Sequence, residues 1–332
     1  TAYEIRLSLV GSEMCIRDRF YGIYGPYWFR FLQERRGPVL MDHLIADGYR
    51  LQAHTSASFT YPEFDNTIFA SVPQDRFVTA NPVLPSWQRD QAMVDRLLAF
   101  VDEDPGTPFF AFELFESPHA RYQFPTDGLL HANYLEDIDF ARVDAARDIA
   151  GIKARYENSC HFLDRQFKRI LERLEQRGLL DSTIVVITGD HGEEFMEHGR
   201  WGHNSAFSRE QIMPPLILSI PGVAATERRD LTSHLDLPAT LLRALGVTNP
   251  ISDYSQGNDL LGPVRREWTV LADWWSVVYA DERDRIVCPL GARLDRALIL
   301  HDEVLVDAEA GDAILMAKRD RLIQMATGLQ TF

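Results

Sequence analysis

The feature that most constrains this sequence is a run of β-branched residues that ends in an acidic residue and a histidine. Residues 182–188 (STIVVIT) have the length and composition of a buried strand, and Gly-Asp-His-Gly-Glu follows at 189–193. In α/β folds, ligands bind beyond the carboxyl ends of the strands. The sequence therefore predicts an α/β fold with a polar site after this strand.

Asp190 and His191 are candidate metal ligands. Asp190 offers a hard carboxylate oxygen and His191 an imidazole nitrogen, and the flanking glycines let the backbone bring both to one ion. The alternative is a polar turn in which His191 only caps local groups. A second motif, HGRWGHNSAFS at 198–208, favours a metal site. It places another histidine, His203, twelve positions after His191, close enough for both side chains to reach the same pocket.

The rest of the chain predicts alternating helices and strands. Proline and glycine boundaries and apolar periodicity predict helices at 38–48, 86–104 (with Ser86 as N-cap), 139–177 and 235–246. Strands are expected at 49–57, 108–116 and 216–222, with a long polar loop at 117–138. After residue 262 the pattern changes to short strands and a helix at 312–327, which predicts a small antiparallel subdomain spanning 263–332.

Composition excludes some classes of function. With 34 basic and 49 acidic residues the formal charge is −15, so no basic face for nucleic acid is expected. Three cysteines make no disulfide framework. No apolar run reaches the roughly 18 residues that a membrane-spanning helix needs, so the fragment itself is expected to be soluble.

Residues 1–19 fit poorly with the rest of the chain. The string SLVGSEMCIRD resembles a translated linker artefact that recurs in metagenomic sequences, and such ends are set aside in fold reasoning. The alternative is a native strand, IRLSLV, followed by a turn. We interpret 1–19 as a non-native linker, 20–262 as the main domain without its first strand, and the chain as an N-terminally truncated fragment.

The motifs together resemble the sulfatase family of the alkaline phosphatase superfamily. FYGIYGPYW, the PHA after a strand, DHGEEF and WGHNSAFS are most similar to the periplasmic domains of YejM-type inner-membrane proteins. The resemblance runs from about Phe20 to about Leu261. It implies an alkaline-phosphatase-like three-layer α/β sandwich with a mostly parallel central sheet, and a metal site with one divalent ion (Zn²⁺, Mn²⁺ or Ca²⁺).

The resemblance also implies roles for individual residues. Asp190 and His191 match metal ligands, and His203 matches a histidine that faces the sulfuryl or phosphoryl oxygens. His119 matches a histidine that approaches the same group, although the proline often found after it is absent. His234 and Asp236, in SHLDLPATLL, either contact the pocket rim, where His234 would bind substrate, or anchor the following helix.

The family's nucleophile is implied to lie just before the FYG motif, with a further acidic ligand on an earlier strand. Both positions fall before Phe20. Cys15 lacks the C-x-P-x-R context of a formylglycine precursor, and Ser12 is no better placed, so the nucleophile is unknown. The fragment is therefore expected to bind metal weakly and to be inactive.

Three functions remain open for the intact protein. The first is a hydrolase or transferase acting on an anionic ester of an envelope lipid or glycan, anchored in the inner membrane by a preceding transmembrane region with its catalytic domain in the periplasm. The second is a catalytically weak binding or regulatory domain in envelope lipid or lipopolysaccharide homeostasis. A cytosolic phosphatase or phosphomutase is disfavoured, because no second metal-binding cluster is evident in the sequence.

Overall fold

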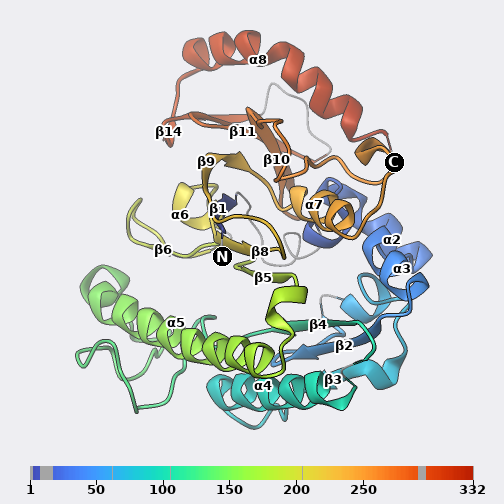
Figure 1. Ribbon diagram of the computed structural model, residues 1–332. Coiled ribbons are helices and arrows are strands. Elements are labelled where there is room, and N and C mark those ends of the chain that lie inside the picture. Colours follow the sequence, from blue (N-terminus) through green and yellow to red (C-terminus); the bar gives the residue numbers. More distant parts are fainter. Residues whose placement is uncertain are drawn as a thin grey trace. The chain divides into compact units, whose positions relative to one another are not determined.

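The structure is a computed structural model that describes residues 3–7, 18–61, 63–104, 106–203, 205–290 and 297–331. The chain divides into two compact units. The first unit comprises residues 1–40, 185–194 and 202–332, and the second comprises 41–184 and 195–201. Figure 1 shows the helices and strands coloured along the sequence.

A three-stranded parallel sheet lies at the centre of the second unit. Its order is β3–β2–β4, with bounds Phe77–Thr79, Arg50–Thr55 and Phe109–Leu114. Helix α4 (Ser86–Glu103) packs against this sheet, and α5 (Ala145–Gln176) packs against α4. Helix α3 (Val39–Ala46) precedes β2. The alternation of helix and strand confirms the predicted α/β class.

The two long helices begin differently from the prediction. Ser86 is the first residue of α4 and does not cap it, so that prediction is wrong. Instead the side-chain oxygen of Gln123 accepts a hydrogen bond from the Ser86 amide at 2.7 Å. Helix α5 begins at Ala145 rather than 139, because the Asp144 side chain caps it by accepting a hydrogen bond from the Arg147 amide.

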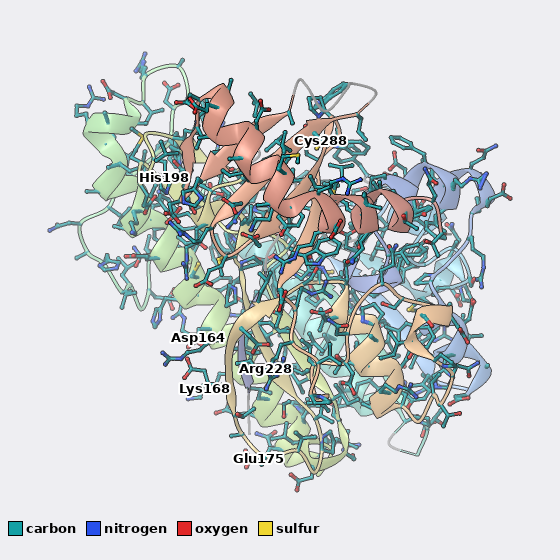
Figure 2. All side chains as sticks on the ribbon, turned by 90° about the horizontal axis from the view of Figure 1, so that it is seen from above. Asp164, Lys168, Glu175, His198, Arg228 and Cys288 are labelled. Carbon is teal, nitrogen blue, oxygen red and sulfur yellow. The ribbon has the colours of Figure 1, made fainter. Side chains whose placement is uncertain are left out.

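Asp164 is exposed on α5, as are Lys168 and Glu175 farther along the same helix (Figure 2). Asp164 is therefore a solvated charge on the outer face of α5.

The first unit contains a mixed four-stranded sheet in the order β5–β8–β1–β9. The β5–β8 and β8–β1 pairs are antiparallel, and β1–β9 is parallel. The strand bounds are Val185–Thr188 (β5), Pro215–Ser219 (β8), Tyr3–Leu7 (β1) and Glu227–Thr232 (β9). Strand β1 lies within the segment interpreted as a linker. Strand pairing gives backbone geometry and not the origin of the residues, so the linker interpretation stays a prediction.

The antiparallel C-terminal sheet that the sequence predicted is confirmed. It has the order β10–β11–β12–β13–β14, with bounds Trp268–Ala272, Ser276–Asp281, Asp284–Pro289, Leu298–His301 and Val304–Leu305. Helix α8 (Ala308–Gly328) follows and begins four residues earlier than predicted, because the Asp307 side chain caps it. From this helix, the Lys318 ammonium pairs with both Asp281 and Asp284 of the sheet.

Shorter elements complete the described chain. They are the helices α2 (Trp28–Glu34), α6 (Arg209–Ile212) and α7 (Asp236–Ala244), the strands β6 (Glu194–Phe195) and β7 (Trp201–Gly202), and 3-10 turns at Gly25–Tyr27, Phe64–Asn66, Gln74–Arg76, Leu180–Ser182 and Ile251–Asp253. Within the described ranges, no helix is long and apolar enough to cross a membrane.

A buried carboxyl group in the second unit has a consequence for stability. Among the described residues, neither carboxylate oxygen of Glu113 on β4 has a hydrogen-bond partner. One of these oxygens lies 4.0 Å from Nδ1 of His54, and Asp90 is an acidic neighbour. Burial, and then the charge of Asp90, raise the pKa of Glu113 well above its usual range. Burial also lowers the pKa of His54 to about 4, so the imidazole is neutral at physiological pH.

Glu113→Gln is therefore expected to be more stable than the parent chain at alkaline pH. In the unfolded chain Glu113 ionises above its ordinary pKa of 4.5, whereas the folded carboxyl keeps its proton. The contribution of the protonated Glu113 carboxyl to the free energy of unfolding is fully present below the unfolded pKa. It is lost as the pH rises towards the folded pKa. Urea unfolding at several pH values measures this: the advantage of the variant should grow from pH 4 to pH 8. A difference that stays constant with pH contradicts the prediction.

Candidate functional site

The predicted metal-ligand pair lies immediately after β5. The strand ends at Thr188, so Asp190 and His191 sit in the loop at its carboxyl end. One oxygen of Asp190 accepts a hydrogen bond from the His191 amide at 3.1 Å. The other, Oδ2, lies 3.7 Å from Nε2 of the imidazole. Ligand atoms around a tetrahedral zinc ion are separated by about 3.3 Å, so both atoms are placed to approach one cation.

The hydrogen bonding of His191 leaves one nitrogen available as a ligand. Its Nδ1 lies 2.7 Å from the carbonyl oxygen of Gly192. A carbonyl only accepts, so Nδ1 carries the proton and donates it. The lone pair of the neutral imidazole is then on Nε2, the atom beside the Asp190 carboxylate. An imidazole fixed in this way by a backbone carbonyl is typical of metal-binding histidines.

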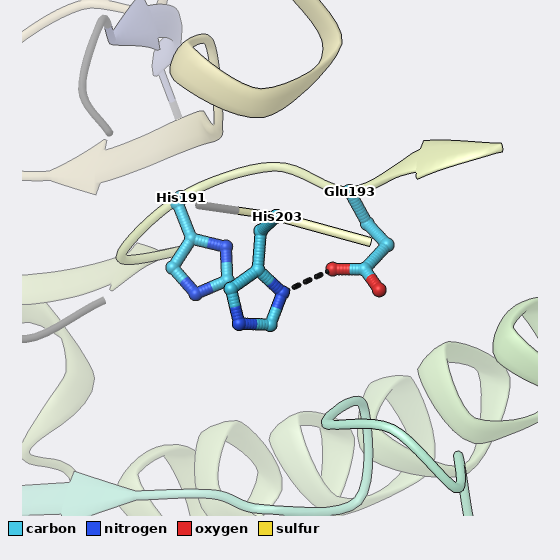
Figure 3. A group of neighbouring side chains, drawn as sticks. All are labelled: His191, Glu193 and His203. Carbon is cyan, nitrogen blue, oxygen red and sulfur yellow. Dashed lines mark hydrogen bonds and ion pairs between the residues drawn. The ribbon is translucent and has the colours of Figure 1, made fainter. Parts of the chain in front are cut away.

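A second histidine, His203, lies beside His191 (Figure 3). His203 follows β7, and its ring centroid lies 4.0 Å from that of His191. Its Nδ1 lies 2.6 Å from a carboxylate oxygen of Glu193. Ligand atoms of His191, Glu193 and His203 all lie within 4.8 Å of one another. Thus Asp190, His191 and His203, which the sequence singled out, lie in one loop cluster of the first unit.

Glu193 is a member of this cluster that sequence reasoning missed. It was part of the quoted motif, but nothing in its position showed that its side chain would meet His203. The signal that could have found it is its spacing. Glu193 is followed at once by the short β6–β7 hairpin that returns the chain to His203. The Glu193 side chain is only 6% exposed, so its charge is held beside the imidazole rather than in water.

Electrostatics in the cluster favour a carboxylate beside cationic groups. Burial acts to raise the pKa of Asp190, but electrostatic interactions with His191 and Arg19, with smaller contributions, outweigh it and lower that pKa. Burial acts to lower the pKa of His203, but the hydrogen bond and charge of Glu193 outweigh it and raise that pKa. Asp190 is thus ionised and ready for a cation, and His203 is favoured as a proton donor.

Gly192 is required by close packing rather than by an unusual backbone angle. A Cβ atom placed on it would lie 1.9 Å from the backbone carbonyl oxygen of Glu210. The Gly192 amide donates a 2.9 Å hydrogen bond to the carbonyl of Gln211. Beside it, the buried Glu194 carboxylate accepts hydrogen bonds from Ser208 and Gln211. These contacts fix the loop that carries His191 and Glu193.

Gly192→Ala is expected to weaken metal binding and to lower the free energy of unfolding by about 2 kcal/mol, because backbone has to move to admit the methyl group. Thermal unfolding and metal titration measure the two effects. Gly199→Ala is a spatial control, since no atom of the described residues beyond its chain neighbours lies within 4 Å of its Cβ position, although its φ of +78° adds backbone strain. A Gly192→Ala variant with unchanged metal affinity would contradict the role given to this contact.

His119 belongs to the second unit. It lies in the turn after β4, where its side chain is exposed and its carbonyl accepts a hydrogen bond from the Tyr122 amide. Asp90 of α4 holds the start of this turn by accepting hydrogen bonds from the Glu116 amide and from the amide and hydroxyl of Ser117. The turn that carries His119 is thus tied to the first turns of α4. Its role towards substrate stays a prediction.

His234 is fully buried in the first unit, just before α7. Its neighbour Asp236 accepts hydrogen bonds from the amides of Ser233 and Asn258 and forms an ion pair with Arg266. These contacts describe an anchor for α7, one of the two roles that the sequence left open for this segment. A substrate-binding role for His234 stays a prediction. Cys15 and Ser12 lie outside the described residues.

The donor set fits a divalent ion of borderline hardness. One carboxylate, one imidazole nitrogen with a free lone pair and a second histidine nearby are ligand types that zinc and manganese accept. Calcium prefers an all-oxygen set, which these residues do not provide. Metal dependence is a property of the family, and the identity of the ion here stays a prediction.

Comparisons with known proteins show the family to which the chain belongs. The sulfatase family model matches residues 19–247, more than half of the chain. The inner membrane protein YejM of Salmonella typhimurium is 26% identical over 259 residues, which cover 76% of this chain and 38% of that protein. The chain thus spans less than half the length of the YejM proteins that it matches.

Two solved structures show the same fold. A protein in the alkaline phosphatase superfamily from Vibrio parahaemolyticus superposes with a TM-score of 0.62 at 16% identity, covering 94% of this chain and 75% of that one. The phosphonate monoester hydrolase of Agrobacterium radiobacter gives a TM-score of 0.67 at 16% identity, covering 100% of this chain and 89% of that one. The chain therefore belongs to the sulfatase family, with the fold of the alkaline phosphatase superfamily.

Proposed function

We propose that the intact protein is a metal-dependent hydrolase or transferase that acts on a sulfate ester or a phosphodiester of an envelope lipid or glycan. One observation carries the proposal. The free Nε2 of His191, a carboxylate oxygen of Asp190 and the His203–Glu193 pair converge in one loop after β5. The name of the family favours sulfate esters as substrates. A phosphonate monoester hydrolase of the same fold favours esters of a phosphorus acid.

Each residue has a separate task in this proposal. Asp190 and His191 would hold the metal, which offsets negative charge on the transferring group and activates the nucleophile. His203 donates a hydrogen bond to an oxygen of that group, or a proton to the leaving oxygen. Glu193 orients the His203 ring and favours its protonated form. His119 is proposed to approach the same group.

The location of the intact protein is part of the proposal. The matched YejM proteins are described as inner membrane proteins. We propose that the intact protein is anchored in that membrane through a region preceding Phe20, and that its sulfatase-like domain lies in the periplasm. The nucleophile and an additional acidic ligand are proposed to lie in the same preceding region, so the chain of 332 residues is expected to lack turnover.

Assays with two chromogenic substrates test the proposal. 4-Nitrophenyl sulfate and bis(4-nitrophenyl) phosphate are incubated with Mn²⁺, Zn²⁺ or Ca²⁺ and either this chain or a form with the native upstream sequence. We expect turnover only in the longer form, abolished by His203→Ala. Turnover by the 332-residue chain would contradict the placement of the nucleophile. A longer form that binds metal but turns over no ester would support the alternative, a binding or regulatory domain.

A further inference from the structure

Two tryptophans occupy the tip of the hairpin that joins β10 to β11. The Asp273 amide donates to the Ser276 carbonyl at 3.0 Å and closes the turn around Trp274 and Trp275. The Asp273 carboxylate accepts from the Trp275 and Ser276 amides. Tight hairpin tips favour glycine, asparagine and aspartate, which allow the backbone to turn. The Trp275 side chain is 79% exposed, so burial in this fold does not explain its presence there.

Other exposed apolar side chains surround this tip. The Phe29 ring of α2 is 57% exposed, and its centroid lies 5.9 Å from that of Trp274. Leu290 is 46% exposed, and its amide donates to the Trp275 carbonyl at 2.6 Å. We call Phe29, Trp274, Trp275 and Leu290 the aromatic end. All four belong to the first unit. A contiguous exposed group of this kind marks an interaction surface.

Helix α2, which contributes Phe29 to the aromatic end, and the residues directly after it carry exposed arginines. Arg30 follows Phe29 on α2, and Arg35 and Arg36 follow the end of that helix. All three are exposed, and Glu34 is the one acidic residue among positions 29–36. In a chain of net charge −15, this local excess of arginine stands out. A partner that complements both the apolar side chains and the arginines has an anionic outer layer with apolar material directly beneath it.

We propose that the aromatic end is a docking surface for a phospholipid bilayer that contains anionic lipid. Tryptophan prefers the boundary between headgroups and hydrocarbon, because its ring is apolar and its N–H remains in a polar layer. Arg30, next to Phe29 on α2, and the arginines at the end of that helix would pair with lipid phosphates. A second copy of this chain fits less well, because a two-fold contact through the same patch would bring like-charged arginines together. The proposal rests on the membrane setting proposed above and adds the surface that meets the membrane.

The test is sedimentation of the chain with vesicles of phosphatidylcholine, with and without phosphatidylglycerol. We expect binding only with phosphatidylglycerol, falling as salt rises. Trp275→Ser should weaken binding about tenfold, and Arg30→Glu with Arg35→Glu should weaken it by about fivefold for each charge. Tyr61→Ser is the matched control, since Tyr61 is an aromatic residue of the second unit that is 65% exposed. It should bind like the parent chain.

Two further measurements keep the outcomes distinct. Quenching of tryptophan fluorescence by brominated phosphatidylcholine mixed with phosphatidylglycerol should be strong in the parent chain and reduced in Trp275→Ser. Metal titration and thermal unfolding of Trp275→Ser should match the parent, which separates lost docking from lost folding. Unchanged vesicle binding in Trp275→Ser would overturn the proposal, as would a parent chain that is dimeric and becomes monomeric in the variant. Failure of metal binding or catalysis in the form with the native upstream sequence would count against the proposed function and not against this surface.

Discussion

The His191→Ala variant is expected to bind Mn²⁺ or Zn²⁺ about a hundredfold more weakly than the parent chain. Loss of an outer hydrogen-bond partner of a metal ligand costs about 10–100-fold in affinity, and removal of the ligand itself costs at least the upper end of that range. Nε2 of His191 is the nitrogen whose lone pair is left free by the bond from Nδ1 to Gly192. Titration calorimetry at constant pH measures the change.

Two matched variants sharpen this test. Glu193→Gln keeps a hydrogen bond to His203 but removes the charge, so we expect a smaller loss of affinity, about tenfold. His131→Ala removes a surface histidine of the second unit that pairs with Glu157, and it should leave metal affinity unchanged. Equal affinity in His191→Ala and the parent would show that the metal, if bound, is held elsewhere. Sub-micromolar affinity in the parent would contradict the expectation of a weak, incomplete site.

Asp236→Ala is expected to lower the free energy of unfolding by about 3–5 kcal/mol, because removal of one partner of a buried ion pair leaves the other charge without compensation. The Asp236 side chain is 2% exposed and pairs with Arg266, which is 10% exposed. Its oxygens also accept from the Ser233 amide at 2.8 Å and the Asn258 amide at 2.7 Å. Urea unfolding followed by tryptophan fluorescence measures the loss.

The result also distinguishes the two interpretations of the segment that contains His234. If Asp236 anchors α7, the double variant Asp236→Ala/Arg266→Met should recover part of the stability, because no charge remains unpaired. Asp253→Ala, an exposed carboxylate nearby in sequence, should change stability by less than about 0.5 kcal/mol. A small stability change in Asp236→Ala together with weakened ester binding would instead favour the pocket rim.

The sequence predicted what depends on local pattern. The β-branched run ending in Asp190 and His191 predicted a strand and a polar loop, and both are present. Helix starts were predicted less accurately, because the residue that caps a helix can come from elsewhere in the chain. Ser86 looked like an N-cap, yet Gln123 performs that task from across a loop. Asp144 caps α5, which begins six residues after the predicted start, and periodicity alone did not reveal this.

What depends on pairing between distant segments could not be read from the sequence. Glu193 contacts His203 because the short β6–β7 hairpin between them brings the chain back beside Glu193. Adjacent Glu193 and Glu194 look equivalent in the sequence, but one binds His203 and the other binds Ser208 and Gln211 inside the unit. The antiparallel pairing of β8 with β5 is likewise set by contacts that no local motif specifies.

The hydrogen bonds between α4 and the turn that carries His119 imply that the two move together. Gln123 caps the helix, while Asp90 of the helix holds the turn at Ser117. Opening the turn would therefore uncover the first amides of α4, and fraying of α4 would release the turn. In native-state hydrogen exchange, the amides of Ser86 and Ser117 should exchange at matching rates, as parts of one cooperative opening unit. A ligand that reached His119 would then slow exchange in a helix that it never touches.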